Sequence, residues 1–171
     1  MGYTMSVPLF SSPALSVLPF AEGDLPEVLR VYKQCEDFLA LGPVATASME
    51  MVREDIRHSR EEGGSYCVIR TAAGETAGIL DFVPRHGPPG TAFLSLLMIG
   101  APFRGRGIGS ETVALLEAHL RERHAVRTVE SGVQVNNKPG IRFWTGQGYR
   151  IVSGPALMPD TTVACQLRKE I

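Results

Sequence analysis

The chain has 171 residues, of which 44% are hydrophobic and 20% are charged, and its net charge at pH 7 is −1. These values are typical of one soluble globular domain with a full hydrophobic core. The near-neutral charge argues against binding to a nucleic-acid backbone, which requires a basic surface. No apolar run reaches the roughly 18 residues that a membrane span needs, so no membrane partner is expected.

The beginning of the chain is expected to form a flexible arm. Residues 1–15 carry Ser, Pro and Thr without a hydrophobic period, which leaves residues 16–171 as a single domain. Three prolines (Pro8, Pro13 and Pro19) and the lack of a basic leader argue against a secretory signal. We therefore expect a cytoplasmic protein.

Cysteine usage agrees with a reducing compartment. The three cysteines are too few and too widely spaced for a disulfide framework or a metal set: Cys35, Cys67 and Cys165. We expect three free thiols and no metal site.

Apolar spacing and turn residues predict a mixed α+β domain. The predicted strands cover residues 16–20, 65–71, 75–83, 91–99, 127–135, 149–152 and 161–167. The predicted helices cover residues 24–35, 48–62, 110–124 and 137–147. Short turns join three strands in series, which favours an antiparallel meander, whereas the strand after the third helix makes a parallel crossover. We expect about seven strands, mainly antiparallel, flanked by about four helices in three layers.

Two helix starts carry capping residues. Asp24 is the expected N-cap of the first helix, with Glu27 three residues on, close to a capping box, and Ser48 is the expected N-cap of the second. Between these helices, residues 36–41 mix carboxylates with apolar groups. They are expected either to line a substrate pocket or to form an ordinary helix end.

The residues with the clearest chemistry are Arg104-Gly105-Arg106-Gly107-Ile108-Gly109-Ser110. Three glycines in five positions let backbone N–H groups approach an anion, and a helix opening directly afterwards adds its positive end. The spacing G-x-G-x-G is not the dinucleotide fingerprint, and no lysine follows as in a triphosphate P-loop. The stretch predicts a pyrophosphate-sized cradle.

The pattern Arg104-x-x-Gly107-x-Gly109 resembles the R/Q-x-x-G-x-G/A motif of the GNAT N-acetyltransferase superfamily. The resemblance continues on both sides, with Leu97-Met98-Ile99 before the motif and Asn137 lying eleven residues before Gly148-Tyr149. It covers residues 15–169. It implies the acyl-CoA N-acyltransferase fold, in which the fourth and fifth strands part and acetyl-CoA lies in the gap.

By this resemblance, acetyl-CoA is the co-substrate and a primary amine is the acceptor. A strand N–H near Met98 would polarise the thioester carbonyl. Arg104 would reach phosphate oxygens, and Arg106 would either do the same or point to solvent. The residues expected to bind the cofactor are Leu97, Met98, Ile99, Arg104, Gly105, Arg106, Gly107, Ile108, Gly109, Ser110, Asn137, Phe143 and Trp144. A homodimer paired through the last strands is compatible with this family.

The catalytic groups stay open. Many relatives carry a tyrosine as general acid seven residues after the motif asparagine, where this chain has Trp144, which has no acidic proton. Glu130 and Asp81 are the candidate general bases, and Ser131 and Gln134 are candidates for binding substrate or relaying a proton. The expected activity is N-acetyl transfer by direct attack of the amine. The alternatives are a catalytically weak acyl-CoA sensor and an enzyme that uses another acyl-CoA.

Overall fold

A computed structural model describes residues 6–171 and contains one eight-stranded sheet within that range. The strands are β1 (Phe10–Ser11), β2 (Leu15–Pro19), β3 (Ser65–Thr71), β4 (Thr76–Val83), β5 (Thr91–Ile99), β6 (Thr128–Gln134), β7 (Arg150–Leu157) and β8 (Val163–Glu170). The helices are α1 (Leu25–Gln34), α2 (Glu36–Leu39), α3 (Met49–Glu61), α4 (Ile108–His124) and α5 (Lys138–Gly146), with short 3-10 turns at Glu22–Asp24 and Ala101–Phe103. The expected mixed α+β architecture is confirmed.

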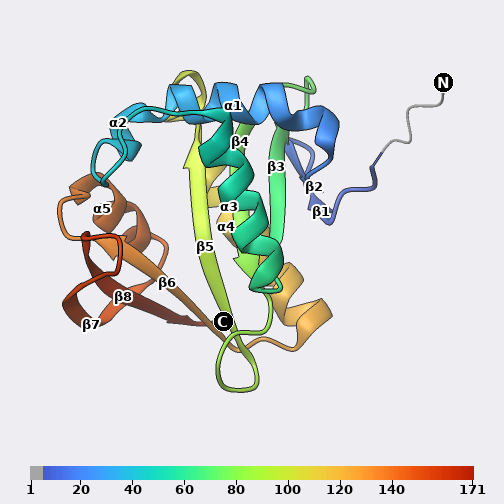
Figure 1. Ribbon diagram of the computed structural model, residues 1–171. Coiled ribbons are helices and arrows are strands. Elements are labelled where there is room, and N and C mark those ends of the chain that lie inside the picture. The colour runs from blue at the N-terminus through green and yellow to red at the C-terminus, as the bar shows by residue number, and fades with distance from the viewer. Residues whose placement is uncertain (1–5) are drawn as a thin grey trace.

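The sheet has the strand order β1-β2-β3-β4-β5-β6-β8-β7. Every recorded neighbouring pair is antiparallel except β5 and β6, which the α4 crossover makes parallel, as predicted. These two strands pair only from Thr91↔Thr128 to Leu94↔Ser131, although both continue beyond that point. Figure 1 shows the result: β6, β7 and β8 lean away from β5, and the two halves of the sheet form a V.

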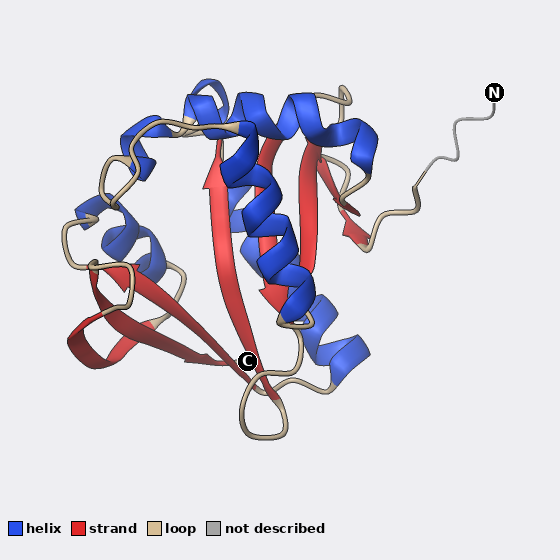
Figure 2. Cartoon of the chain, viewed as in Figure 1, coloured by secondary structure: helices blue, strands red, loops and turns tan. Residues whose placement is uncertain are grey.

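Helices cover both faces of the sheet (Figure 2). Successive strand residues point to opposite faces, so Cys67 and Leu80 join the core shared with α4, while Val68 and Ile79 join the core shared with α1 and α3. Each fully buried aliphatic side chain contributes roughly 1.5–3 kcal/mol. The two cores therefore fix the sheet on which the site is built.

The two predicted caps have different outcomes. Ser48 is confirmed as the N-cap of α3, because its Oγ accepts a hydrogen bond from the N–H of Met51 at 3.1 Å. The predicted side-chain cap of α1 is wrong, since Asp24 makes no such bond to α1. Its carboxylate instead accepts bonds from the N–H of Ala21 at 2.8 Å and from the Arg70 guanidinium at 2.6 Å. An ion pair from β3 thus replaces the local cap.

Part of the expected N-terminal arm belongs to the sheet. Phe10 and Ser11 form β1, which pairs with β2 and is the additional strand beyond the predicted seven. The chain reverses because the N–H of Ser12 donates to the Leu15 carbonyl at 2.8 Å, and Phe10 packs against the main core. Residues 1–5 of the expected arm lie outside the described residues.

Two further findings concern the whole described chain. Cys35, Cys67 and Cys165 are buried and free within it, as expected. No helix in residues 6–171 combines the length and the apolar character needed to cross a membrane.

Candidate active site

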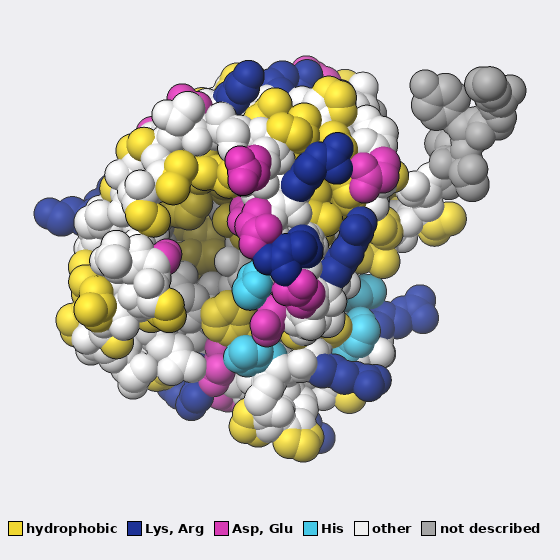
Figure 3. Space-filling model, in the orientation of Figure 1, with side chains coloured by type: hydrophobic (Ala, Val, Ile, Leu, Met, Phe, Trp, Pro, Cys, Tyr) yellow, Lys and Arg dark blue, Asp and Glu magenta, His cyan; other side chains and the backbone are white. Residues whose placement is uncertain are grey.

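A pocket of about 590 Å³ opens where β5 and β6 part. The two strands form its walls with residues 94–99 and 131–134, and α2 and α5 close two further sides. Figure 3 shows the molecule hollowed beside α3, with mainly apolar side chains on the floor of the hollow. The open question about residues 36–41 is thereby answered: α2 is a short helix, and Asp37, Phe38 and Leu41 also line the pocket.

The backbone of Met98 is directed away from the pocket. Its carbonyl oxygen lies against β4, since a Cβ added to Gly78 would approach it to 2.4 Å. The N–H of Gly100 also faces β4 and donates to the Ala77 carbonyl at 2.8 Å. Because backbone groups two residues apart along a strand point to the same edge, the N–H of Met98 is on the β4 side too.

The neighbouring amides of β5 face the pocket instead. The carbonyl oxygen of Ile99 accepts bonds from Arg104 Nε at 2.9 Å and from the Cys35 thiol at 3.4 Å, both on the pocket side. By the same alternation, the N–H groups of Leu97 and Ile99 point into the gap where β6 no longer pairs. The pocket is therefore edged by strand backbone that is free to bond an extended amide chain.

The glycine loop lies at the open end of this wall. Gly105 and Gly107 have φ values of +74° and +78°, which side-chain-bearing residues rarely adopt, and a Cβ on either would meet no atom within 4 Å. The backbone is thus bare where α4 begins, and the first N–H groups of α4 have no partner within the helix. Free N–H groups and a helix dipole make this end of the pocket suited to an anion.

Gly109 has a different role from Gly107. A Cβ at Gly109 would lie 3.3 Å from Phe143, so this glycine allows α5 to pack closely against α4. Ser110 accepts a hydrogen bond from the Gln147 side chain at 2.8 Å, which ties the end of α5 to the same turn. The pocket wall formed by α5 is therefore positioned by the glycine loop.

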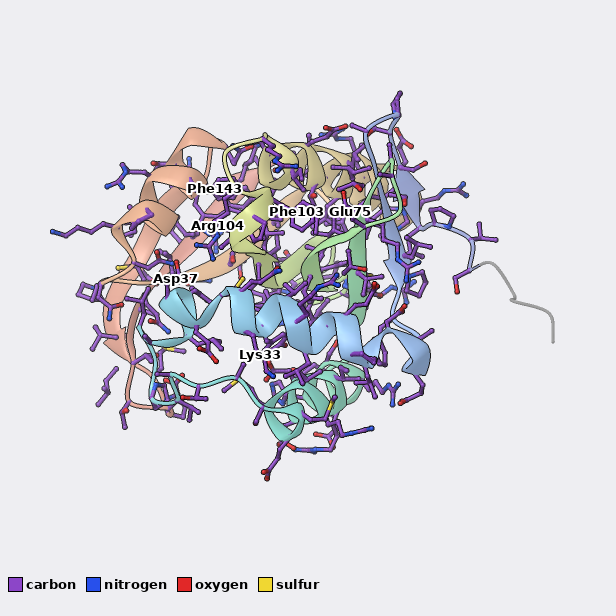
Figure 4. The ribbon with its side chains drawn as sticks, turned by 90° about the horizontal axis from the view of Figure 1, so that it is seen from above. Lys33, Asp37, Glu75, Phe103, Arg104 and Phe143 are labelled. Atoms are coloured by element: carbon purple, nitrogen blue, oxygen red, sulfur yellow. The ribbon has the colours of Figure 1, made fainter. Side chains whose placement is uncertain are left out.

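Arg104 is bound within the protein. Its guanidinium donates two hydrogen bonds to the carboxylate of Asp37, at 2.6 and 3.0 Å, and Figure 4 shows the two side chains bridging the glycine loop and α2. The hydrogen bonds from Arg104 hold the pKa of Asp37 below its usual range. The other motif arginine, Arg106, stacks over the Phe103 ring at 5.5 Å.

Aromatic residues form the α5 side of the site. The Trp144 ring packs edge-on against Phe143 and Tyr149 at about 5 Å, and only 8% of Trp144 is exposed. Tyr149 is buried, and its hydroxyl donates to Glu117 at 3.1 Å, so it belongs to the core. Asn137 caps α5, because its Oδ1 accepts from the N–H of Gly140 at 2.9 Å.

The two candidate general bases lie away from the pocket lining in the described chain. Glu130 accepts two bonds from the Arg168 guanidinium, at 2.7 and 3.2 Å. Asp81 is buried under α3, where it accepts a bond from Ser59 Oγ at 2.6 Å, and this burial raises its pKa. The described residues also contain no group of three or more His, Cys, Asp and Glu side chains that could hold a metal ion.

Comparison with known proteins identifies the family. Residues 27–149 match the family described as the acetyltransferase (GNAT) family. The chain belongs to the GNAT acetyltransferases. Comparison with curated protein sequences gives no match.

Solved structures of acetyltransferases share this fold over nearly their whole length. An acetyltransferase from Thermus thermophilus is 23% identical with a TM-score of 0.77, over 92% of this chain and 97% of that one. The ribosomal alpha-N-protein acetyltransferase RimL is 18% identical with a TM-score of 0.80, over 100% and 98%. A Vibrio cholerae spermidine N-acetyltransferase in complex with CoA and spermine is 11% identical with a TM-score of 0.73, over 91% and 95%. At these identities the likeness concerns the fold.

Two residues that line the pocket were not predicted to do so from the sequence alone. Asp37 was only part of an ambiguous stretch, and its partner Arg104 lies 67 residues further along the chain. Cys35 was assigned only as a free thiol, yet it lines the pocket and touches Ile99. Both contacts depend on how α2 folds over the end of β5, and no local signal in the sequence reports that.

Proposed function

We propose that the protein is an N-acetyltransferase that transfers the acetyl group of acetyl-CoA to a primary amine. The observation that carries this proposal is the gap between β5 and β6, edged by the free N–H groups of Leu97 and Ile99. The pantetheine arm of acetyl-CoA contains two amides in an extended chain, which can pair with β5 as a further strand would. The volume of the pocket, about 590 Å³, suits such an arm.

The glycine loop supports the other end of the same ligand. Gly105 and Gly107 leave the backbone bare, and the N–H groups at the start of α4 would hold the pyrophosphate. For the Arg104 side chain to reach a phosphate, it would have to leave Asp37, so we assign the phosphate contacts chiefly to backbone. Asn137, Phe143 and Trp144 form the facing wall.

The chemistry requires a neutral amine and an activated carbonyl. Acetyl-CoA supplies a thioester; the amine nitrogen bonds to the acetyl carbon, the carbon–sulfur bond breaks, and one proton leaves the nitrogen while the thiolate takes up one. The N–H of Leu97 or Ile99, rather than that of Met98, would donate to the carbonyl oxygen as negative charge develops there. Trp144 offers no acidic proton, and a thiol with a pKa near 8.5 leaves as thiolate without one.

Proton removal from the amine is assigned to solvent. The predicted bases Glu130 and Asp81 are each hydrogen-bonded to another side chain outside the pocket lining. A primary amine with a pKa of about 10.4 is mostly ammonium at pH 7, and the small fraction that has given its proton to water enters a pocket of low charge. Whether either carboxylate acts as a base is tested by the substitutions given in the Discussion.

The decisive experiment measures release of the CoA thiol from acetyl-CoA across a broad panel of primary amines. We expect release to require an amine and the N-acetyl product to appear in equal amount. Calorimetry with acetyl-CoA alone checks binding in parallel. Tight binding of acetyl-CoA without release of the CoA thiol in the presence of any amine would contradict the N-acetyltransferase and support the acyl-CoA sensor. Preferential binding of another acyl-CoA would show that acetyl-CoA is not the acyl donor.

A further inference from the structure

The side-chain amide oxygen of Gln134, Oε1, is a buried hydrogen-bond acceptor that has no partner among the described residues. Gln134 ends β6 and lines the pocket. Leu94 and Ser131 are the last residues that pair across β5 and β6. Gln134 lies three residues beyond this pair on β6, and Leu97 lies three residues beyond it on β5. Gln134 therefore stands opposite the free edge of β5. A buried carbonyl without a donor costs free energy, so a ligand that donates an N–H there is favoured.

The Gln134 side chain reaches the connection that follows α2. A Cβ added to Gly42, in the connection after α2, would lie 3.7 Å from Gln134 Nε2. A second cavity of about 330 Å³ lies along this connection and shares Leu41 and Asn136 with the first. Gln134 thus lines the first pocket near the residues that the two cavities share.

The lining of both cavities is almost free of charge. In the described chain, the charged side chains that line them are Asp37 and Arg104, and these two bind each other. The remaining polar groups are amides and hydroxyls, including Asn136 and Thr162. In Figure 3 the charged side chains gather over α3, beside the hollow and not on its floor.

An uncharged hydrogen-bond acceptor, such as the Gln134 amide oxygen, binds a neutral amine better than a carboxylate would. A carboxylate stabilises the ammonium form, which has no lone pair to attack the thioester, whereas an amide oxygen accepts one N–H of the neutral amine. A polyamine carries further positive charges, and the single carboxylate that lines these cavities is already bonded to Arg104. The lining therefore disfavours a polycation.

We infer that Gln134 binds the attacking nitrogen and that the acceptor is a monoamine whose remainder is uncharged. This inference rests on the proposed N-acetyltransferase function. Gln134 is then a specificity-determining residue on the β6 wall, opposite the backbone that holds the donor.

The experiment compares 1-aminohexane with 1,6-diaminohexane, which differ in one terminal charge. With the full chain, we expect kcat/KM to be about tenfold higher for the monoamine. Gln134→Met keeps the length of the side chain and removes the hydrogen-bond acceptor. We expect it to lower kcat/KM for the monoamine about tenfold, the effect of losing one hydrogen bond. The affinity for acetyl-CoA should stay unchanged. Gln134→Glu adds a carboxylate and is expected to shift the preference toward the diamine.

Gln166→Met is the matched control, because Gln166 lies on β8 outside the pocket lining and its side chain bonds only Ser153 in the described structure. It should leave both rates unchanged. A preference of the unaltered protein for the diamine, or full monoamine activity in Gln134→Met, overturns the inference and leaves the N-acetyltransferase standing. Activity with other amines but with neither of these two also overturns it. Failure of every amine, with acetyl-CoA still bound, overturns the proposed function itself.

Discussion

The two walls of the pocket are built from different parts of the chain. The β5 wall and the glycine loop present backbone: the N–H groups of Leu97 and Ile99 and the bare turn at Gly107. The β6 wall presents side chains, above all the unpaired amide oxygen of Gln134. Backbone can bind any ligand with the right amides and phosphates, so it suits a donor common to a family. Side chains can change without altering the fold, so they suit an acceptor that differs between members.

The largest effect is expected at the backbone wall. Gly107→Val forces a β-branched residue into a left-handed turn and projects a side chain over the anion cradle. We expect the Kd for acetyl-CoA to rise by about 100-fold or more, as measured by calorimetry. This would show that the donor depends on the backbone.

Gly63→Val is the matched control for that substitution. Gly63 has a φ of +72° and, like Gly107, no atom within 4 Å of an added Cβ, but it ends α3 away from the pocket. It introduces the same local strain, so thermal unfolding of both variants should be lowered alike. Unchanged acetyl-CoA affinity in Gly107→Val, or an equal loss of affinity in Gly63→Val, would contradict the proposal that the glycine loop binds the pyrophosphate.

Asp81→Asn tests whether the buried carboxylate of Asp81 takes part in catalysis or only lowers the stability of the fold at neutral pH. Burial and nearby Asp55 raise the pKa of Asp81, while Ser59 and His58 act in the opposite direction. A carboxyl with a raised native pKa binds its proton more tightly when folded, so the free energy of unfolding falls as pH rises above the usual Asp range. Replacing it by Asn should therefore raise the free energy of unfolding at pH 7.

The increase in the free energy of unfolding caused by Asp81→Asn should shrink as pH is lowered toward about 4, where the carboxyl of the unfolded chain protonates. Urea denaturation between pH 4.5 and 8 measures it, and acetyl transfer should stay unchanged. Asp160→Asn is the control of opposite sign, because hydrogen bonds from Thr162 lower the pKa of Asp160 and make its ionised form favourable. A kcat loss of tenfold or more in Asp81→Asn would instead support a general base.

Asp37→Asn tests the link between the two walls. It weakens the bidentate contact that joins α2 to the glycine loop, and a partly exposed ion pair contributes at most about 1 kcal/mol. We expect KM for the amine to rise about threefold while the Kd for acetyl-CoA changes less than twofold. Because the native pKa of Asp37 is lowered, the pair should persist at neutral pH and be lost only as pH falls below the usual Asp range. A larger effect on acetyl-CoA than on the amine would place Arg104 on the phosphate.

Glu130→Gln should have the smallest effect. Glutamine keeps the Oε1 that accepts the Arg168 hydrogen bonds, and the side chain does not line the pocket. We expect kcat to change by less than about twofold. Steady-state kinetics with a saturating amine measures this, and a steep loss of kcat together with a lost acidic limb of the pH profile would make Glu130 the base.

The sequence predicted the order of the elements that build the pocket far better than the side-chain contacts within it. Local patterns fix a strand that precedes a glycine turn and a helix, so the parallel crossover and the Ser48 cap were predicted correctly. The Asp24 cap failed because a partner 46 residues away, Arg70, takes its carboxylate. The Asp37–Arg104 contact and the unpaired oxygen of Gln134 likewise depend on tertiary packing, which leaves no local pattern.

The central claim is that the free edge of β5 binds the donor, and amide hydrogen exchange tests it most directly. In the absence of ligand, the N–H groups of Leu97 and Ile99 should exchange rapidly, whereas that of Met98, which faces β4, should already be protected. Adding acetyl-CoA should slow exchange at Leu97 and Ile99 by about 100-fold or more and leave Met98 little changed. Unchanged exchange at Leu97 and Ile99 with acetyl-CoA bound would contradict the account.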